Sequence, residues 1–202
     1  MTRPVFISAL MLSLALSGGA GATATIGQPA PDITLTDVDG KTVHLADFKG
    51  KHVVLEWNNP QCPFVKKHYD SGNMQSLQKR YDAKDTIWLT INSASTKSRE
   101  FMANDKLKAY IAGQNAAPDA YLTDPETRVA REYGAKTTPH MFVINPAGVI
   151  VYAGAIDSIS STNKDDVKIA RNFVVAALEE SKAGKPVSVS NTTPYGCFVA
   201  YQ

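Results

Sequence analysis

Cys62 stands where an apolar segment gives way to a helical pattern, and no other position in the chain is as well suited to chemistry. The apolar residues Val53–Leu55 come shortly before it. Pro63 follows, and proline is favoured at the first position of a helix because its missing N–H has no partner there. Cys62 is therefore expected at the helix N-cap, where unpaired N–H groups and the helix dipole stabilise a thiolate. A thiolate is a nucleophile, and the predicted chemistry is that of a thiol redox site.

The chain has one other cysteine, Cys197, near its C-terminus. Two cysteines in an oxidising compartment suggest a disulfide. One interpretation is a permanent bond that pins the C-terminal segment to the domain. The other is a reactive pair that opens and closes, and the expected N-cap position of Cys62 favours it.

An oxidising compartment is expected because the N-terminus has the pattern of a secretory signal peptide. A positive residue is followed by an apolar run at 5–16 and by small residues that offer cleavage near residue 22 or 24. The predicted domains are a signal peptide at 1–24, one domain at 25–183 and a tail at 184–202. The apolar run is too short to span a bilayer. We therefore predict a periplasmic or secreted protein without stable membrane insertion after cleavage, and a retained anchor is the alternative.

Composition narrows the classes of partner. The 202 residues are 44% hydrophobic and 20% charged, which suits one globular domain with a substantial core. Lys and Arg number 21 against 19 Asp and Glu. Cleavage of the signal peptide would remove Arg3 and bring the two totals closer still. Such a balanced surface argues against nucleic acid and against a polybasic membrane patch.

Hydrophobic periodicity and turn residues predict the elements that position Cys62. Strands are predicted at 33–35, 42–45, 52–57, 86–91, 120–122, 141–144 and 149–152. Helices are predicted after Cys62 with a break at Ser71-Gly72, at 98–114, from 125 to 134 and from 165 to 178. Asp39-Gly40 predicts a hairpin turn between the first two strands. Continuous apolar strands separated by helices predict an α/β sheet covered on both faces, and the tail is predicted as a loop.

This order of elements resembles the thioredoxin-fold superfamily, in its branch of exported redoxins related to peroxiredoxins, the AhpC/TSA-like group. The matching segments are I-G-Q-P-A-P-D at 26–32, D-G-K-T-V at 39–43, C-P-F-V-K-K-H-Y at 62–69, T-T-P-H at 137–140 and Y-G-C at 195–197. The resemblance implies a thioredoxin-like fold: a central mixed sheet flanked by helices, with an N-terminal β-hairpin extension and a C-terminal tail.

The resemblance also implies roles for five residues. Cys62 takes the position of the nucleophile, and Cys197 resembles a resolving cysteine. Pro139 takes the place of the cis-proline that faces the nucleophile in thioredoxins, which would leave the backbone of Thr138 free to pair with a substrate. An ordinary proline at the start of a strand is the alternative. Asn59 stands where peroxiredoxins carry a threonine, and it is a candidate to hydrogen-bond a thiolate or a peroxide.

Departures from the family patterns bear on the reaction. Thioredoxins carry C-x-x-C, but Val65 takes the place of the second cysteine, so a mixed disulfide has no local resolving partner. Peroxiredoxins use an arginine near the thiolate, and Arg128 and Arg131 are candidates that no motif separates. Lys66 and Lys67 would favour the thiolate if they turned toward it, and a solvated helix face is the other interpretation.

Three functions stay open. A thiol peroxidase, an antioxidant enzyme in which Cys62 attacks a peroxide and Cys197 captures the sulfenic acid, is placed slightly ahead. A thiol–disulfide oxidoreductase would act on exported proteins or small thiols, with an unknown thiol reductant. A redox sensor or copper-binding module without turnover would use Cys62, His68 and His140 as metal ligands. No cofactor is predicted, and a bound metal is not the favoured interpretation.

Overall fold

The computed structural model describes residues 23–81 and 85–201 of the 202-residue chain. The predicted signal peptide, residues 1–24, lies almost entirely outside these ranges. Within the two described ranges, no helix is long and apolar enough to cross a bilayer.

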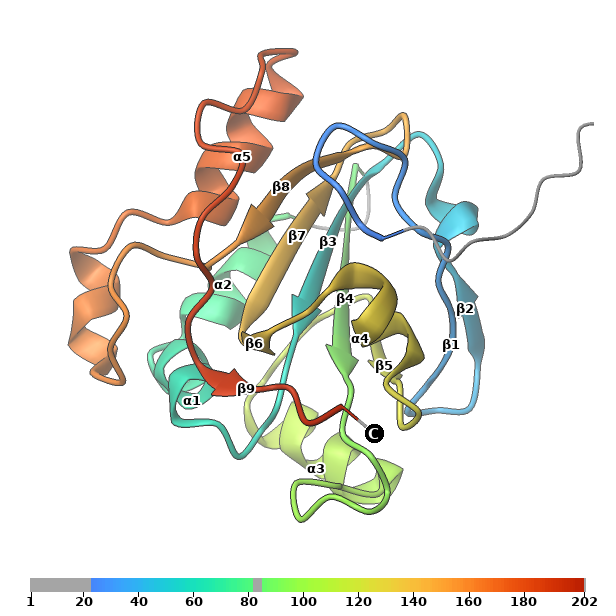
Figure 1. Ribbon diagram of the computed structural model, residues 1–202. Helices are drawn as coiled ribbons and strands as arrows, with labels where there is room; N and C mark the ends of the chain where they lie inside the picture. Colours follow the sequence, from blue (N-terminus) through green and yellow to red (C-terminus); the bar gives the residue numbers. More distant parts are fainter. Residues whose placement is uncertain (1–22, 82–84, 202) are drawn as a thin grey trace, which may run out of the picture.

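A mixed sheet forms the centre of the molecule, with the strand order β2-β1-β5-β4-β3-β7-β8 (Figure 1). Its strands are β1 (Thr34–Asp37), β2 (Thr42–His44), β3 (His52–Trp57), β4 (Thr86–Asn92), β5 (Ala120–Thr123), β7 (His140–Ile144) and β8 (Ile150–Gly154). The central strands β3, β4 and β5 run parallel, whereas β7, β8 and the β1–β2 hairpin pair antiparallel with their neighbours. The predicted mixed sheet and N-terminal hairpin are confirmed.

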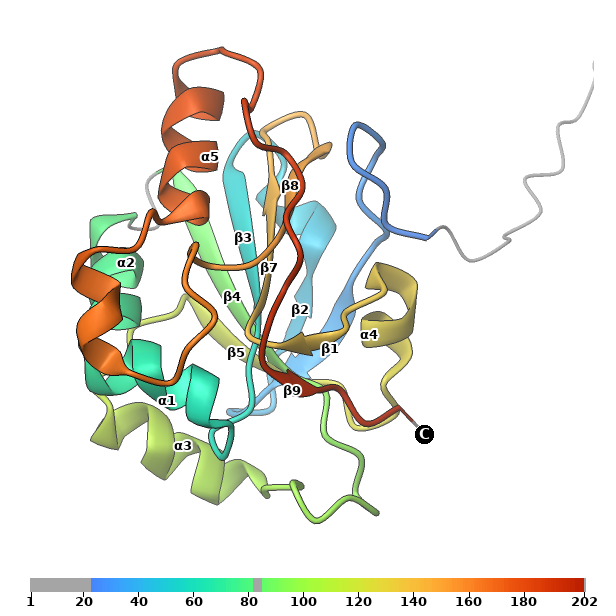
Figure 2. The ribbon, with the colours of Figure 1, turned by 60° about the vertical axis from the view of Figure 1, so that its left-hand side comes forward.

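Helices cover both faces of this sheet. On one side lie α1 (Pro63–Asp70), α2 (Asn73–Arg80), α3 (Asn104–Gly113) and α5 (Phe173–Lys182), and on the other lies α4 (Arg128–Tyr133) (Figure 2). Successive side chains of β7 point alternately into two separate cores. Met141 and Val143 pack in the same core as Cys62, while Phe142 and Ile144 pack on the α4 side. Cys62 therefore belongs to the layer formed by α1, α2 and α5.

Local sequence sets the ends of α1 as predicted. Cys62 is the N-cap, with extended backbone angles of φ −71° and ψ 124°, and Pro63 is the first helical residue. Gly72 adopts a left-handed φ of 75°, which separates α1 from α2 at the predicted break. Cys62 is thus held at a helix N-terminus by its immediate neighbours in sequence.

Three predicted helices differ from the structure, and one of them, expected from 125 to 134, begins only at Arg128. The helix expected at 98–114 begins only at Asn104, because Ser95 and Ser98 accept hydrogen bonds from backbone N–H groups two residues onward and form turns instead. The helix expected from 165 to 178 is broken into a short 3₁₀ turn, η2 (Lys164–Lys168), and α5. Asn172 causes this break, since its side chain caps α5 by accepting from the N–H of Val175 at 2.9 Å.

The tail, predicted as a loop, contains a short strand. This strand, β9 (Cys197–Phe198), pairs antiparallel with β6 (Thr137–Thr138). Before that pairing, the tail follows β8, where Ala153 donates to the carbonyl of Ser190 and accepts from the N–H of Thr192. Figures 1 and 2 show the tail running from α5 along β8 to β9, near α1. Backbone pairing therefore brings the C-terminal cysteine to the end of the fold where Cys62 lies.

Candidate active site

The Cys62 thiol is buried against the backbone of Thr138. Its side chain is 1% exposed, and its Sγ donates to the carbonyl oxygen of Thr138 at 3.0 Å. The peptide bond between Thr138 and Pro139 is cis, as the resemblance predicts. The N-cap of α1 and the turn into β7 thus meet at one sulfur–oxygen contact.

Cys197 arrives at the same place from the tail. In the β6–β9 ladder its register partner is Thr138. Gly196 permits this close approach, because a Cβ atom there would lie 2.0 Å from the Thr138 carbonyl oxygen. Both cysteines are free thiols in this structure. Thr138 was expected to leave its backbone free for a substrate, but the tail pairs with it instead.

The two thiols differ in their surroundings. Burial raises the pKa of the Cys197 thiol to about 12, and the adjacent Cys62 sulfur and the Glu100 carboxylate add to this effect. Cys197 is therefore protonated at neutral pH. Cys62 is the N-cap of α1, the position for which the sequence predicts the attacking sulfur.

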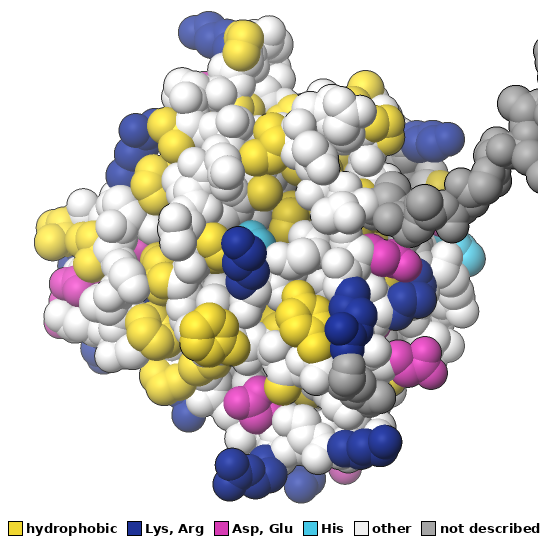
Figure 3. Space-filling view, in the orientation of Figure 1, with side chains coloured by type: hydrophobic (Ala, Val, Ile, Leu, Met, Phe, Trp, Pro, Cys, Tyr) yellow, Lys and Arg dark blue, Asp and Glu magenta, His cyan; other side chains and the backbone are white. Residues whose placement is uncertain are grey.

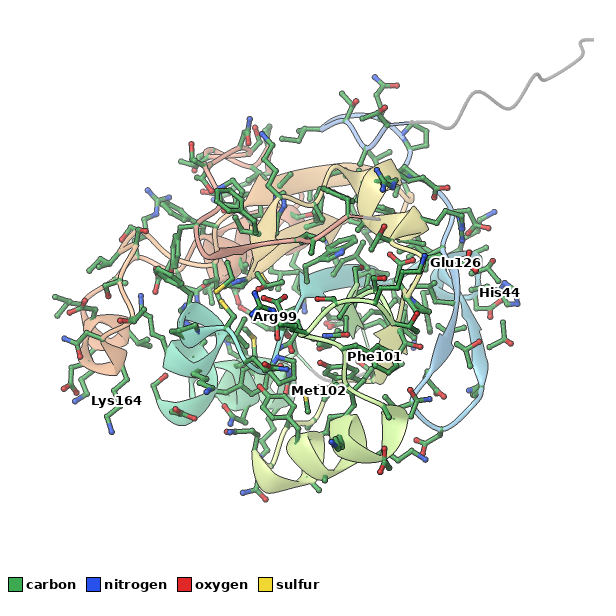
Figure 4. All side chains as sticks on the ribbon, turned by 60° about the horizontal axis from the view of Figure 1, so that its bottom comes forward. His44, Arg99, Phe101, Met102, Glu126 and Lys164 are labelled. Atoms are coloured by element: carbon green, nitrogen blue, oxygen red, sulfur yellow. The ribbon has the colours of Figure 1, made fainter. Side chains whose placement is uncertain are left out.

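Asn59 belongs to the turn that leads into Cys62. Its Nδ2 donates to Oε2 of Glu100 at 2.8 Å, and its Oδ1 accepts from the N–H of Gln61 at 2.9 Å. Glu100 lies on the loop at 93–103 that precedes α3. Its neighbours in sequence, Arg99 and Phe101, are labelled on this loop in Figure 4. The Asn59 side chain therefore closes its own turn through Oδ1 and ties that turn to the neighbouring loop through Nδ2.

The two arginine candidates belong to α4, on the opposite side of the sheet from Cys62 (Figure 2). Arg128 forms an ion pair of 2.8 Å with Glu132. Arg131 lies over the ring of Tyr201 in the tail, 4.9 Å from its centroid. These contacts give both guanidinium groups structural partners away from the Cys62 layer.

The lysine pair divides between surface and core. Lys66 is exposed, in agreement with a solvated helix face. Lys67 is only 2% exposed, and its Nζ lies 3.1 Å from Oδ2 of Asp157 and 2.7 Å from the carbonyl oxygen of Ile159. The solvated-face interpretation is wrong for Lys67, because an ion pair and a carbonyl replace the water that its ammonium loses.

The three metal candidates are not brought together. The His140 ring lies 4.6 Å from that of Phe142, on the α4 side, where it lines a groove of about 760 Å³. Cys62 packs with Met141 on the other side. Strand alternation is the reason, since adjacent residues of β7 face opposite cores. Among residues 23–81 and 85–201, no group of three or more His, Cys, Asp or Glu side chains is arranged to hold a metal ion.

A buried polar cluster lies in the same core as the thiols, and sequence reasoning did not assemble it. It consists of Lys67, His68, Asp157 and Tyr195. His68 was weighed only as a metal ligand, Asp157 was not selected, and Tyr195 entered only through the Y-G-C segment. Lys67 and Asp157 are 90 positions apart. Contacts between residues so distant in sequence leave no periodic pattern in the sequence. The cluster is recognised only in the structure, where Lys67 of α1 is buried.

An apolar surface borders the tail cysteine. Apolar side chains gather over β9 and the nearby end of α1 (Figure 3). Phe198 is 83% exposed, and the ring of Phe64 meets that of Tyr195 edge to face at 5.8 Å. An exposed apolar surface next to a thiol is suited to contact with another molecule.

Comparisons with known proteins agree with this geometry. The AhpC/TSA family model matches residues 26–153. The thiol-disulfide oxidoreductase ResA of Bacillus subtilis is 28% identical over 125 residues, which cover 62% of this chain and 64% of ResA, so the chain spans less than two thirds of that relative. An uncharacterized conserved protein from Geobacillus kaustophilus is 26% identical, with a TM-score of 0.75 over 88% of this chain and 93% of that one. The exposed lipoprotein thioredoxin of Streptococcus pneumoniae is 25% identical, with a TM-score of 0.51 over 68% and 96%.

These comparisons confirm the predicted thioredoxin-like fold and the resemblance to redoxins. The relatives named thiol-disulfide oxidoreductases also bear out the expectation of an oxidoreductase. They favour the thiol–disulfide alternative over the peroxidase interpretation that the sequence placed slightly ahead.

Proposed function

The chain belongs to the AhpC/TSA family, and from its two converging thiols we propose that it is a thiol–disulfide oxidoreductase whose redox couple is Cys62 and Cys197. One observation carries the proposal. The β6–β9 ladder aligns Cys197 with Thr138, and the carbonyl oxygen of Thr138 accepts a hydrogen bond from the Cys62 thiol. The tail thus supplies the second cysteine that C-x-x-C proteins carry one helical turn after the first.

The reaction follows ordinary thiol–disulfide exchange. The Cys62 thiolate attacks one sulfur of a substrate disulfide, the substrate S–S bond breaks, and one substrate thiolate leaves. Cys197 then attacks the Cys62 sulfur of the mixed disulfide, gives up its proton to a leaving thiolate, and releases the second half of the substrate. The substrate gains two electrons, and the protein retains a Cys62–Cys197 disulfide. A thiol reductant restores the two thiols.

Three further residues have supporting roles in this proposal. Thr138 and Pro139 form the backbone wall against which the Cys62 sulfur is held. Asn59 positions the turn before Cys62 through its bonds to Glu100 and Gln61.

Substrates of two kinds fit this chemistry: small disulfides and disulfides of exported proteins. The signal-peptide pattern at residues 1–24 supports export to the periplasm or secretion. The name of the Streptococcus pneumoniae relative, an exposed lipoprotein thioredoxin, supports a place outside the cytoplasm.

Peroxide reduction has weaker support. The Asn59 side chain is bonded at both ends to its own turn and to Glu100, and a peroxide would compete with these bonds. Arg128 and Arg131 belong to α4, which lies across the sheet from α1 and its N-cap Cys62 (Figure 2). Peroxide remains a useful comparison substrate, because the Cys62 sulfur would be the attacking nucleophile in either reaction.

The test is equilibration of the reduced protein with glutathione and glutathione disulfide, followed by acid quenching and mass spectrometry. We expect the wild type to form an intramolecular Cys62–Cys197 bond. Cys197→Ser should accumulate a glutathione mixed disulfide at Cys62, whereas Cys62→Ser should not reduce a disulfide substrate. A wild type that forms no intramolecular bond would refute the proposal. Faster oxidation of Cys62 by stoichiometric hydrogen peroxide than by glutathione disulfide would favour the peroxidase.

A further inference from the structure

The buried cluster beside the thiols has an unusual cation at its centre. Lys67 is 2% exposed, and its Nζ contacts the carboxylate of Asp157 and the carbonyl of Ile159. The same Nζ lies 3.4 Å from the hydroxyl oxygen of Tyr195 and 5.4 Å from the centroid of its ring. A buried ammonium needs such a full set of partners, and the tail tyrosine is one of them.

His68 contributes a second donor. Its Nδ1 lies 3.0 Å from Nδ2 of Asn73, which can only donate, so Nδ1 accepts and the ring proton resides on Nε2. Nε2 lies 3.2 Å from the Tyr195 hydroxyl oxygen and donates to it. Burial lowers the pKa of His68 to about 4, so the ring is neutral at pH 7. This neutral tautomer directs a single N–H at the tail.

The Tyr195 hydroxyl is therefore fully engaged. Its oxygen accepts from His68 and Lys67, and its O–H donates to Oδ1 of Asp157. Hydrogen bonds to charged partners are stronger than neutral ones. The site fits one phenol and fixes where along the chain the tail docks.

The location of this site links it to both cysteines of the proposed redox couple. Tyr195 precedes Cys197 by two residues, and its receptors Lys67 and His68 belong to α1, the helix whose N-cap is Cys62. One helix thus carries both the candidate nucleophile and the receptor for the tail. Cys197 itself lies in the two-residue β6–β9 ladder, which is short for an independent strand pairing, and Val199 continues the pairing by donating to the carbonyl of Lys136.

We propose that Tyr195 is a positioning residue of the thiol couple: the seating of its hydroxyl among Lys67, His68 and Asp157 sets the register in which Cys197 reaches Cys62. This inference rests on the proposed Cys62–Cys197 couple. It assigns the polar cluster to the alignment of that couple, and it predicts that removing one hydroxyl weakens the disulfide without removing either sulfur.

Tyr195→Phe tests the proposal. The change keeps the ring, its contact with Phe64 and the Lys67–Asp157 ion pair, and it removes the hydroxyl alone. The equilibrium constant for forming the Cys62–Cys197 bond from glutathione disulfide should fall roughly tenfold or more, the effect of losing hydrogen bonds to charged groups. Alkylation of Cys62 by iodoacetamide in the reduced protein should accelerate by a similar factor, because the tail no longer covers the thiol.

Tyr201→Phe is the matched control. Its hydroxyl also holds the tail, through the carbonyls of Ala130 and Ala135, but it lies beyond Cys197 and away from α1. We expect this variant to change the equilibrium constant less than threefold. Melting temperatures of all three proteins, measured separately, report the purely structural effect of each hydroxyl.

The outcomes separate the two proposals. If the wild type forms the intramolecular disulfide but Tyr195→Phe forms it with an unchanged equilibrium constant, the positioning role is wrong even where the melting temperature falls. Equal effects of Tyr195→Phe and Tyr201→Phe would also overturn it, because the whole tail and not this site would then set the alignment. A wild type without the disulfide would instead defeat the proposed function.

Discussion

Replacing Gly196 with alanine is expected to detach the tail from the backbone of Thr138 and to expose Cys62. A Cβ atom at this position would lie 2.0 Å from the carbonyl oxygen of Thr138 and 2.7 Å from its carbonyl carbon. These are backbone atoms beside Pro139, so they cannot rotate away as a side chain would. Gly196 also has a φ of 138°, which a residue with a Cβ atom rarely adopts. The docked tail must therefore move.

The magnitude follows from these two terms. Overpacking in a well-packed region costs about 1–3 kcal/mol, and an unfavourable backbone conformation costs about 1–3 kcal/mol. Even at the lower end, the sum shifts the balance from docked to undocked tail by roughly 30-fold. Because Cys62 is 1% exposed in the docked form, its rate of alkylation should rise by at least that factor. The melting temperature of Gly196→Ala, measured separately, reports what the docked tail contributes to the free energy of unfolding.

The assay is iodoacetamide labelling of the reduced protein, with the Cys62 peptide quantified by mass spectrometry over time. Gly184→Ala is the control, because Gly184 also has a positive φ, of 69°, but no atom lies within 4 Å of a Cβ there. We expect its labelling rate to stay within threefold of the wild type. If Gly196→Ala labels at the wild-type rate, the tail does not cover Cys62, and the reasoning from the β6–β9 ladder fails.

Two further predictions concern stability. Burial lowers the pKa of both His68 and His140 to about 4. Between pH 6.5 and 4 the unfolded chain therefore binds protons that the folded protein does not. The free energy of unfolding should decrease as pH falls through this window, by up to about 3 kcal/mol per histidine. Urea denaturation at pH 7, 5.5 and 4.5 measures this, and a His140→Asn protein that keeps the full pH dependence would contradict it. Lys67→Met should destabilise the protein by roughly 3–5 kcal/mol because it leaves Asp157 buried without its cation. The double variant Lys67→Met/Asp157→Leu should recover much of this loss in the same urea denaturation. Equal destabilisation of both proteins would show that the ion pair is not the cause.

Local sequence was enough to predict the position of the candidate nucleophile in the fold. Pro63 at the first helical position makes Cys62 the N-cap, and this depends only on neighbours in the chain. The break at Gly72 and the end of α4 at Gly134 follow from glycine in the same way. Continuous apolar strands such as β3 predicted a doubly covered sheet, and the order of the elements predicted the fold.

Local signals also misled where two of them competed. The helix expected at 98–114 starts late because Ser95 and Ser98 form turns with their own backbone. His140 was expected near Cys62, although the alternation of β7 places it beside Phe142 on the other face. For the helix, the turn-forming serines were present in the sequence, but the helical periodicity outweighed them. For His140, the period of two along the strand gave the correct face, but the closeness of His140 to Pro139 in sequence outweighed it.

Tertiary structure alone decided the environment of the thiols. The tail has no periodicity that predicts β9, and its pairing with Thr138 depends on a fold that is already assembled. Lys67 has the sequence pattern of a surface lysine, yet it is buried because Asp157 and Tyr195 approach it from 90 and 128 positions away. Contacts of such sequence separation are set by how the whole sheet and its helices pack, and no window of neighbouring residues contains them. The amino-acid sequence by itself therefore determined which cysteine stands at a helix N-terminus, and the packed structure determined what covers it and which residue faces it.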